Sequence, residues 1–169
     1  SPSWGTVREE LHNAGHLLWF ACTNLRRSLA PITLCTDAEG ANEKDYGGGA
    51  AVVAPLAPEE ADLVLGADWY GKPGEHGGDK PLFTFVEEKE WFILENKRWV
   101  FEEPIHLGEM AAVLLAVSRL VQSEQARGAS VLLFTDSSVV YYALRKGRSS
   151  RYSLRRRCQK LLAWLIAGN

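Results

Sequence analysis

Residues 31–55 read PITLCTDAEGANEKDYGGGAAVVAP. The apolar residues Ile32 and Leu34 precede an acid, Asp37, and three glycines at 47–49 lead into a second apolar run. Two β-type runs separated by Gly, Asn and Asp predict a β-hairpin with strands at 31–36 and 48–53. A carboxylate in such a strand is costly to bury alone, so Asp37 requires a cation, hydrogen-bond donors or water.

The composition indicates a globular domain over residues 31–169. Of the 169 residues, 46% are hydrophobic and 24% are charged, which is typical of a folded domain. No apolar run reaches the roughly 18 residues of a membrane span, and no signal peptide opens the chain, so we expect no membrane association. The scattered cysteines Cys22, Cys35 and Cys158 have no zinc spacing. They indicate small buried thiols in a reducing intracellular compartment, without distinguishing nucleus from cytoplasm.

Charge is distributed unevenly along the chain. Between Asp37 and Glu103 acids outnumber bases 16 to 6, and no Asp or Glu follows Asp136. This asymmetry favours either an anionic partner at the C-terminal part or a solvated helix face. The bases that we expect to bind nucleic acid are Arg145, Lys146, Arg148, Arg151, Arg155, Arg156 and Arg157.

Helical periodicity begins before the hairpin. Residues 6–29 carry a rough apolar stripe formed by Val7, Leu11, Leu18, Ala21, Cys22 and Leu25, so we expect residues 1–30 to form an N-terminal linking helix. His12 and His16 stand four residues apart, which would suit two metal ligands, but no third ligand has a matching spacing.

The rest of the chain predicts an α/β order. Residues at about 55–90 read as an irregular acidic insertion, and 82–101 as a third strand plus an extra hairpin arm, built from runs at 82–86, 91–94 and 98–101. A helix is expected at 107–122, with Glu109 in its first turn. An apolar strand at 130–135, covered on both faces, ends at Asp136. Two helices follow: the first has Asp136 or Ser137 as its N-cap and stops at Gly147, and the second covers 153–167.

This order places three acids at one point. Sequential strands usually pair and crossovers are right-handed, so the strands at 31–36 and 130–135 should lie side by side beneath the helix at 107–122. Asp37, Glu109 and Asp136 then converge, and such carboxylates repel one another unless a divalent cation neutralises them. Mg²⁺ prefers oxygen ligands, and two ions could serve a phosphodiester cleavage.

Three stretches carry a family resemblance: TDAEGANEKDYGGGAAVV, HLGEMAAVLLAV and VLLFTDSSVVYYALRKGRS. In this order they resemble the ribonuclease H domain of retroelement reverse transcriptases, most closely the DIRS-like kind. The resemblance implies a ribonuclease H-like mixed sheet flanked by helices. It puts Asp37, Glu109 and Asp136 in the places of the catalytic metal ligands, with Mg²⁺ or Mn²⁺, and Gly47 and Gly49 at the hairpin glycines.

The chain departs from this family pattern at several points. Glu39 stands where the family has serine, and Leu107 falls near a family Asn, with His106 beside it as a loop residue or a substrate contact. The last strand and the fourth carboxylate are missing from the sequence, and Glu39 or Asp45 could compensate for the latter.

Two functions remain open. The first is a metal-dependent endonuclease that cleaves the RNA strand of RNA–DNA hybrids as part of a retroelement reverse transcriptase. The second is a catalytically inactive domain of the same fold that docks RNA or supports a larger polyprotein or assembly. A nucleotide binder built on Gly47–Gly49 is disfavoured, because those glycines precede a strand rather than a helix.

Overall fold

The computed structural model describes residues 27–43, 45–61, 85–124 and 126–168. Its strands are β1 (Leu29–Glu39), β2 (Gly48–Pro55), β3 (Phe92–Arg98) and β4 (Ser130–Phe134), and its helices are α4 (Ile105–Leu120), α5 (Ser138–Lys146) and α6 (Tyr152–Ala167). The predicted N-terminal helix lies outside these residues except at its end, where Leu29 and Ala30 open β1 instead. His12, His16 and Cys22 also lie outside them.

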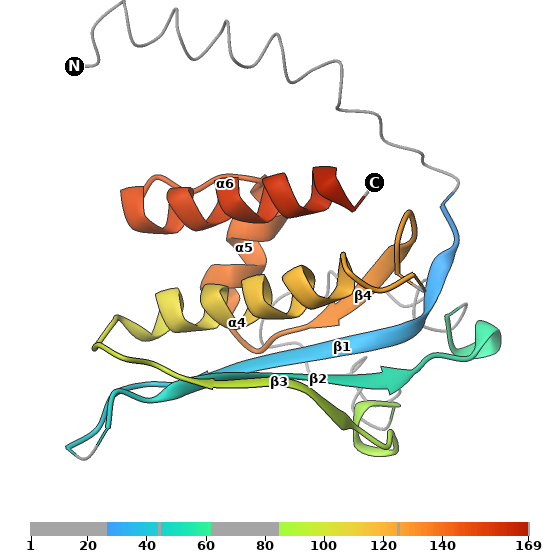
Figure 1. Cartoon of the computed structure of the whole chain (residues 1–169), viewed down its shortest axis with the longest axis horizontal. Coiled ribbons are helices and arrows are strands. Elements are labelled where there is room, and N and C mark those ends of the chain that lie inside the picture. The colour runs from blue at the N-terminus through green and yellow to red at the C-terminus, as the bar shows by residue number, and fades with distance from the viewer. Residues whose placement is uncertain (1–26, 44, 62–84, 125, 169) are drawn as a thin grey trace, which may run out of the picture.

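The sheet has the strand order β3-β2-β1-β4. β1 pairs antiparallel with β2, and β2 with β3, whereas β1 and β4 run parallel. The helix α4 crosses β1, β2 and β3, and α6 lies over α4 (Figure 1). This mixed sheet with its helices confirms the predicted ribonuclease H-like fold class. Within the described residues, the sheet ends at β4.

The hairpin prediction is confirmed, and the glycine at its base shows why. Asp37 in β1 faces Ala50 in β2 across the antiparallel ladder. Gly47 has a φ of 77°, and a Cβ placed there would lie 2.1 Å from the carbonyl oxygen of Glu39. Only glycine tolerates this left-handed backbone at so close an approach, so Gly47 fixes where the chain turns.

The core occupies both faces of the sheet, as the apolar run of β4 predicts. On the helix face Leu34 packs with Ala116 and Leu120. On the other face Leu132 and Phe134 pack against a small cluster formed by Leu56, Ala61 and Phe85. Alternate residues of β4 thus face opposite layers, although Val131–Phe134 are only half-buried.

The prediction for residues 82–101 is wrong in part. Within the described residues this region holds one strand, β3, and residues 85–87 form a helical turn rather than a strand. The indole N–H of Trp91 donates to the carbonyl oxygen of Val86 at 2.9 Å, and the ring of Phe85 lies 5.9 Å from that of Phe134. Burying Phe85 beneath the sheet outweighs its β-propensity, which depends on context.

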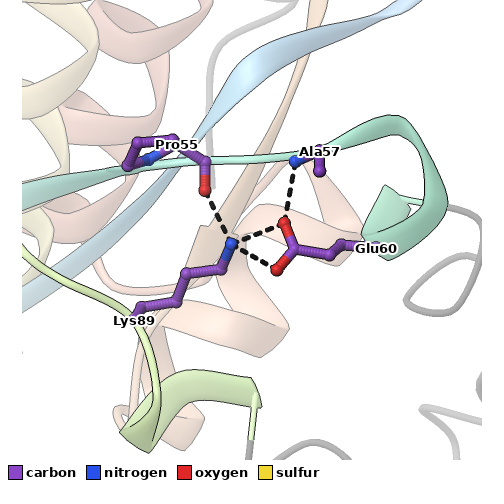
Figure 2. A network of polar contacts seen from close by, with 4 residues as sticks. All are labelled: Pro55, Ala57, Glu60 and Lys89. Carbon is purple, nitrogen blue, oxygen red and sulfur yellow. Dashed lines mark hydrogen bonds and ion pairs between the residues drawn. The ribbon is translucent and has the colours of Figure 1, made fainter.

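A lysine joins the two ends of the acidic insertion (Figure 2). Lys89 Nζ donates to the Pro55 carbonyl oxygen at 2.8 Å and to the two carboxylate oxygens of Glu60 at 2.6 and 2.5 Å. Glu60 in turn accepts a hydrogen bond from the backbone N–H of Ala57 at 2.7 Å. The Lys89 side chain is 12% exposed and that of Glu60 is 33% exposed, so this half-buried network holds the ends of the insertion together.

The helices begin and end largely where the sequence predicts. Ser137 is the N-cap of α5, where its hydroxyl accepts from the N–H of Val140, and Gly147 ends α5 in the left-handed conformation. The helix α4 begins at Ile105, two residues early, because Pro104 precedes it in an extended conformation. Glu109 therefore lies in the second turn of α4, not the first, and His106 lies in the helix rather than in a loop.

Candidate metal centre

Backbone register brings Asp37 and Asp136 to the same level. In the parallel pair, Cys35 of β1 aligns with Phe134 of β4. Asp37 and Asp136 each lie two residues further along, at the carboxyl ends of neighbouring strands. The hydrogen-bonded ladder therefore places the two aspartates side by side, as the sequence predicts.

Glu109 reaches the same point from α4. The preceding residue, Gly108, allows a close approach of helix to sheet, since a Cβ there would lie 3.5 Å from that of Ala38 and 3.3 Å from Trp99 Nε1. The Trp99 ring also covers Gly49, where an added Cβ would lie only 2.6 Å from Trp99 Cζ2. Trp99 is thus wedged between β2 and the start of α4, and any larger residue at Gly49 would displace it.

An arginine holds the start of α4 from the other side. Arg157 Nη1 donates to the Leu107 carbonyl oxygen at 2.7 Å, and Nη2 lies 2.5 Å from both carboxylate oxygens of Glu103. The side chain of Arg157 is 20% exposed, so most of it is inside the protein. Trp99 and Arg157 together fix the helix that carries Glu109.

The three carboxylates converge on one spot. Asp37, Glu109 and Asp136 each offer an oxygen, and these oxygens lie within 4.8 Å of one another. Glu109 is only 8% exposed, whereas both aspartates are exposed to solvent. Glu109 Oε2 is buried without a hydrogen-bond partner among the described residues. A buried charged oxygen without a partner is unfavourable, so the geometry fits a bound cation.

The electrostatics follow from this crowding. Burial raises the pKa of Glu109 to about 7, and the neighbouring charges of Asp136 and Asp37 add to the increase. Burial also raises the pKa of the Cys35 thiol, again with help from both aspartates. Three hard oxygen donors of this kind could hold a metal ion.

The two other acids proposed near the site do not join this group in the described part of the chain. Asp45 accepts from the N–H of Gly47 at 2.8 Å and pairs with Arg98 Nη1 at 2.9 Å, so it serves the hairpin turn. Glu39 borders, with Asp37 and Asp45, a hollow of about 330 Å³ over the ends of β1, β2 and β3. Neither residue supplies a fourth oxygen to the three that converge.

The predicted nucleic-acid-binding bases lie along α5, the following turn and α6. All except Arg157 are exposed, whereas Arg157 is held by Glu103 and Leu107 and so differs from the rest of the run. The guanidinium groups of Arg155 and Arg156 lie 5.5 and 5.9 Å from the exposed Tyr152 ring. Sequence reasoning missed Tyr152, although its spacing of three and four residues from these arginines is the signal that would reveal it.

Comparisons with models of known protein families, with curated proteins and with solved structures find no match to this chain. Its relation to retroelement ribonuclease H domains therefore stays a prediction from the sequence. In the part of the chain that the structure describes, no helix is both long and apolar enough to cross a membrane.

Proposed function

We propose that this chain is a metal-dependent endonuclease in which Asp37, Glu109 and Asp136 hold the ions. The observation that carries the proposal is the buried, unpartnered Glu109 Oε2 beside two aspartates from neighbouring parallel strands. Bound there, Mg²⁺ or Mn²⁺ would activate a water molecule and neutralise charge on a phosphodiester. Trp99 and Arg157 act indirectly, because they hold the helix that presents Glu109.

The proposed substrate is the RNA strand of an RNA–DNA hybrid, within a retroelement reverse transcriptase. The sequence resemblance supports this choice, and the exposed bases of α5 and α6 support an anionic partner. Such a surface would contact the phosphate backbone without reading base sequence. The hybrid would then be distinguished by its duplex shape and by its 2′-hydroxyl groups.

The direct test is cleavage of a labelled RNA–DNA hybrid during a titration of Mg²⁺ or Mn²⁺. We expect cleavage of the RNA strand that depends on the ion, stops with a chelator and is lost in Asp136→Asn. Matched RNA–RNA and DNA–DNA duplexes serve as controls for substrate class. Equal cleavage by Asp136→Asn and the parent chain would contradict the metal role.

A non-catalytic role is the second candidate, and the site itself favours it in one respect. Within the described residues only three carboxylates converge, and the sheet ends at β4. In this case the chain would bind the hybrid or RNA in a salt-dependent manner without cutting it at any ion concentration. Binding without cleavage would thus select docking over catalysis.

A further inference from the structure

Three tyrosines of α5 and α6 present their rings to solvent. Tyr141 is 38% exposed, Tyr142 is 46% exposed and Tyr152 is 65% exposed. The rings of Tyr141 and Tyr142 meet nearly edge to face, with their centres 5.2 Å apart. Both helices turn other residues inward, and the buried ones are Val140, Ala143, Leu154, Cys158 and Leu161. Tyrosine is common where proteins bind partners, because its ring has a large apolar face and a polar tip.

Basic side chains stand beside these rings. The guanidinium groups of Arg155 and Arg156 lie 5.5 and 5.9 Å from the centre of the Tyr152 ring. On α5, Lys146 Nζ lies 5.9 Å from the centre of the Tyr142 ring. Residues three and four positions apart share one face of a helix, so each cation falls beside a ring. The outer face of the two helices therefore combines aromatic surface with positive charge.

Neither helix carries an acid that could neutralise these charges. The sequence has no Asp or Glu after Asp136, and Arg148 and Arg151 add exposed charges between α5 and α6. Arg157 differs from them, because it forms an ion pair with Glu103. An excess of positive charge on one face favours an anionic partner.

This face lies beside the metal centre without forming part of it. The helix α5 begins two residues after Asp136, and Arg157 of α6 donates to the Leu107 carbonyl oxygen at the start of α4. Figure 1 shows α4 and α6 beginning at the same end of the molecule. The face contains none of the three converging carboxylates, so binding to it requires no metal ion.

We propose that this face binds single-stranded nucleic acid. We call it the tyrosine face, and it consists of Tyr141, Tyr142, Lys146, Tyr152, Arg155 and Arg156. Unpaired nucleobases stack on the rings, and the phosphates between them contact the basic side chains. Internal nucleobases of a duplex already stack on one another, so a duplex can use the charges of this face but not its rings. The activity goes beyond the proposed nuclease, because it needs neither an ion nor cleavage.

The test measures binding by fluorescence anisotropy in excess EDTA, so that neither an ion nor cleavage contributes. The probes are a labelled RNA of about 20 nucleotides without self-complementarity and the blunt hybrid that it forms with its DNA complement. We expect the full chain to bind the single strand. Tyr152→Leu should weaken that binding about tenfold and change hybrid binding less than about twofold. Tyr152→Phe, which keeps the ring, should bind the single strand like the parent.

Two further variants separate the rings from the charges. Tyr46→Leu is the matched control, because Tyr46 is 51% exposed but lies between β1 and β2. It should leave both affinities within about twofold of the parent. Arg155→Gln with Arg156→Gln should weaken binding of both probes. For the single strand it should reduce the slope of log affinity against log salt by about 1.4, because two phosphate contacts are lost.

Three results would overturn the proposal. The first is a parent chain that does not bind the single strand in EDTA. The second is an equal effect of Tyr152→Leu on both probes, or no effect on either, since charge alone would then account for binding. The third is a polyglutamate peptide of matched charge that displaces the RNA as well as unlabelled RNA does, which would identify an acidic protein as the partner. Hybrid cleavage with Mg²⁺ tests the nuclease separately, so either proposal can fail alone.

Discussion

Glu60 and Glu109 sit on opposite faces of one sheet and have opposite electrostatic surroundings. Glu60 accepts from Lys89 and from the N–H of Ala57, and these contacts lower its pKa. Glu109 faces two aspartates, and burial with their charges raises its pKa to about 7. The protein supplies a cation where the carboxylate is structural. The described residues supply no cation at Glu109, so a cation from solution should affect Glu109 more than Glu60.

The largest expected effect separates the two glutamates by activity. Glu109→Gln should reduce ion-dependent cleavage of the hybrid by about 100-fold or more, because it removes a charged ligand from the ion. Glu60→Gln, the matched control, should leave the rate within about twofold, because its network lies beneath the other face. Initial rates at saturating Mg²⁺ measure both. Equal losses in the two variants would remove the distinction.

The next effect concerns the cation of the structural network. Lys89→Met should lower the free energy of unfolding by about 2–3 kcal/mol, because it leaves the Glu60 carboxylate and the Pro55 carbonyl oxygen without their donor. Urea denaturation measures this change. Adding Glu60→Gln to Lys89→Met should restore part of the loss, since the stranded charge is gone. An unchanged midpoint in Lys89→Met would show that the network contributes nothing.

The pH dependence of the metal-free protein should have opposite signs at the two sites. The pKa of Glu109 is raised in the folded protein, so its contribution to the free energy of unfolding is fully present below about pH 4.5. This contribution is lost as the pH rises to about 7, which lowers the free energy of unfolding by about 2 kcal/mol. Glu60 has a lowered pKa, so its contribution to the free energy of unfolding is present above pH 4.5 and is lost at lower pH. Denaturation in chelator across this range measures both slopes. Glu109→Gln should abolish the first slope only, and a parent profile that is flat from pH 4.5 to 7 would contradict it.

The smallest effect is stabilisation by the ion. Mg²⁺ at about five times its dissociation constant should stabilise the parent by about 1 kcal/mol, because it binds the folded state alone. Lys89→Met should retain this increment, and Glu109→Gln should lose it. Thermal melts with and without Mg²⁺ compare the three proteins, and NaCl at matched ionic strength serves as a control for general ionic effects. A shift retained in Glu109→Gln would place the ion elsewhere.

Much of the metal centre is predictable from sequence because it depends on local patterns. The alternating hairpin, the apolar run of β4 and the periodicity of α4 fix which elements neighbour one another, and these neighbours bring Asp37, Glu109 and Asp136 together. The sequence predicts Glu109 in the first turn of α4 and the structure places it in the second, because helix starts depend on capping detail. Here Pro104, without a side-chain cap, starts the helix early.

The structural contacts were not predictable because their partners are distant in sequence. Lys89 pairs with Glu60 across 29 residues of an acidic stretch in which every acid resembles the others. Arg157 resembles its basic neighbours in sequence. However, Leu154, Cys158 and Leu161 are buried, and helical geometry puts position 157 beside them, unlike 155 and 156. The spacing of buried residues was the available signal for this difference.

The three acids of the metal centre stand at positions 37, 109 and 136, on β1, on α4 and just after β4. During synthesis, a growing chain therefore has no pocket for an ion until the segment with the last acid has left the ribosome and paired with β1. A translation product that stops before Asp136 would therefore lack this ion pocket. A bound ion would thus report that β4 has paired with β1 beneath α4.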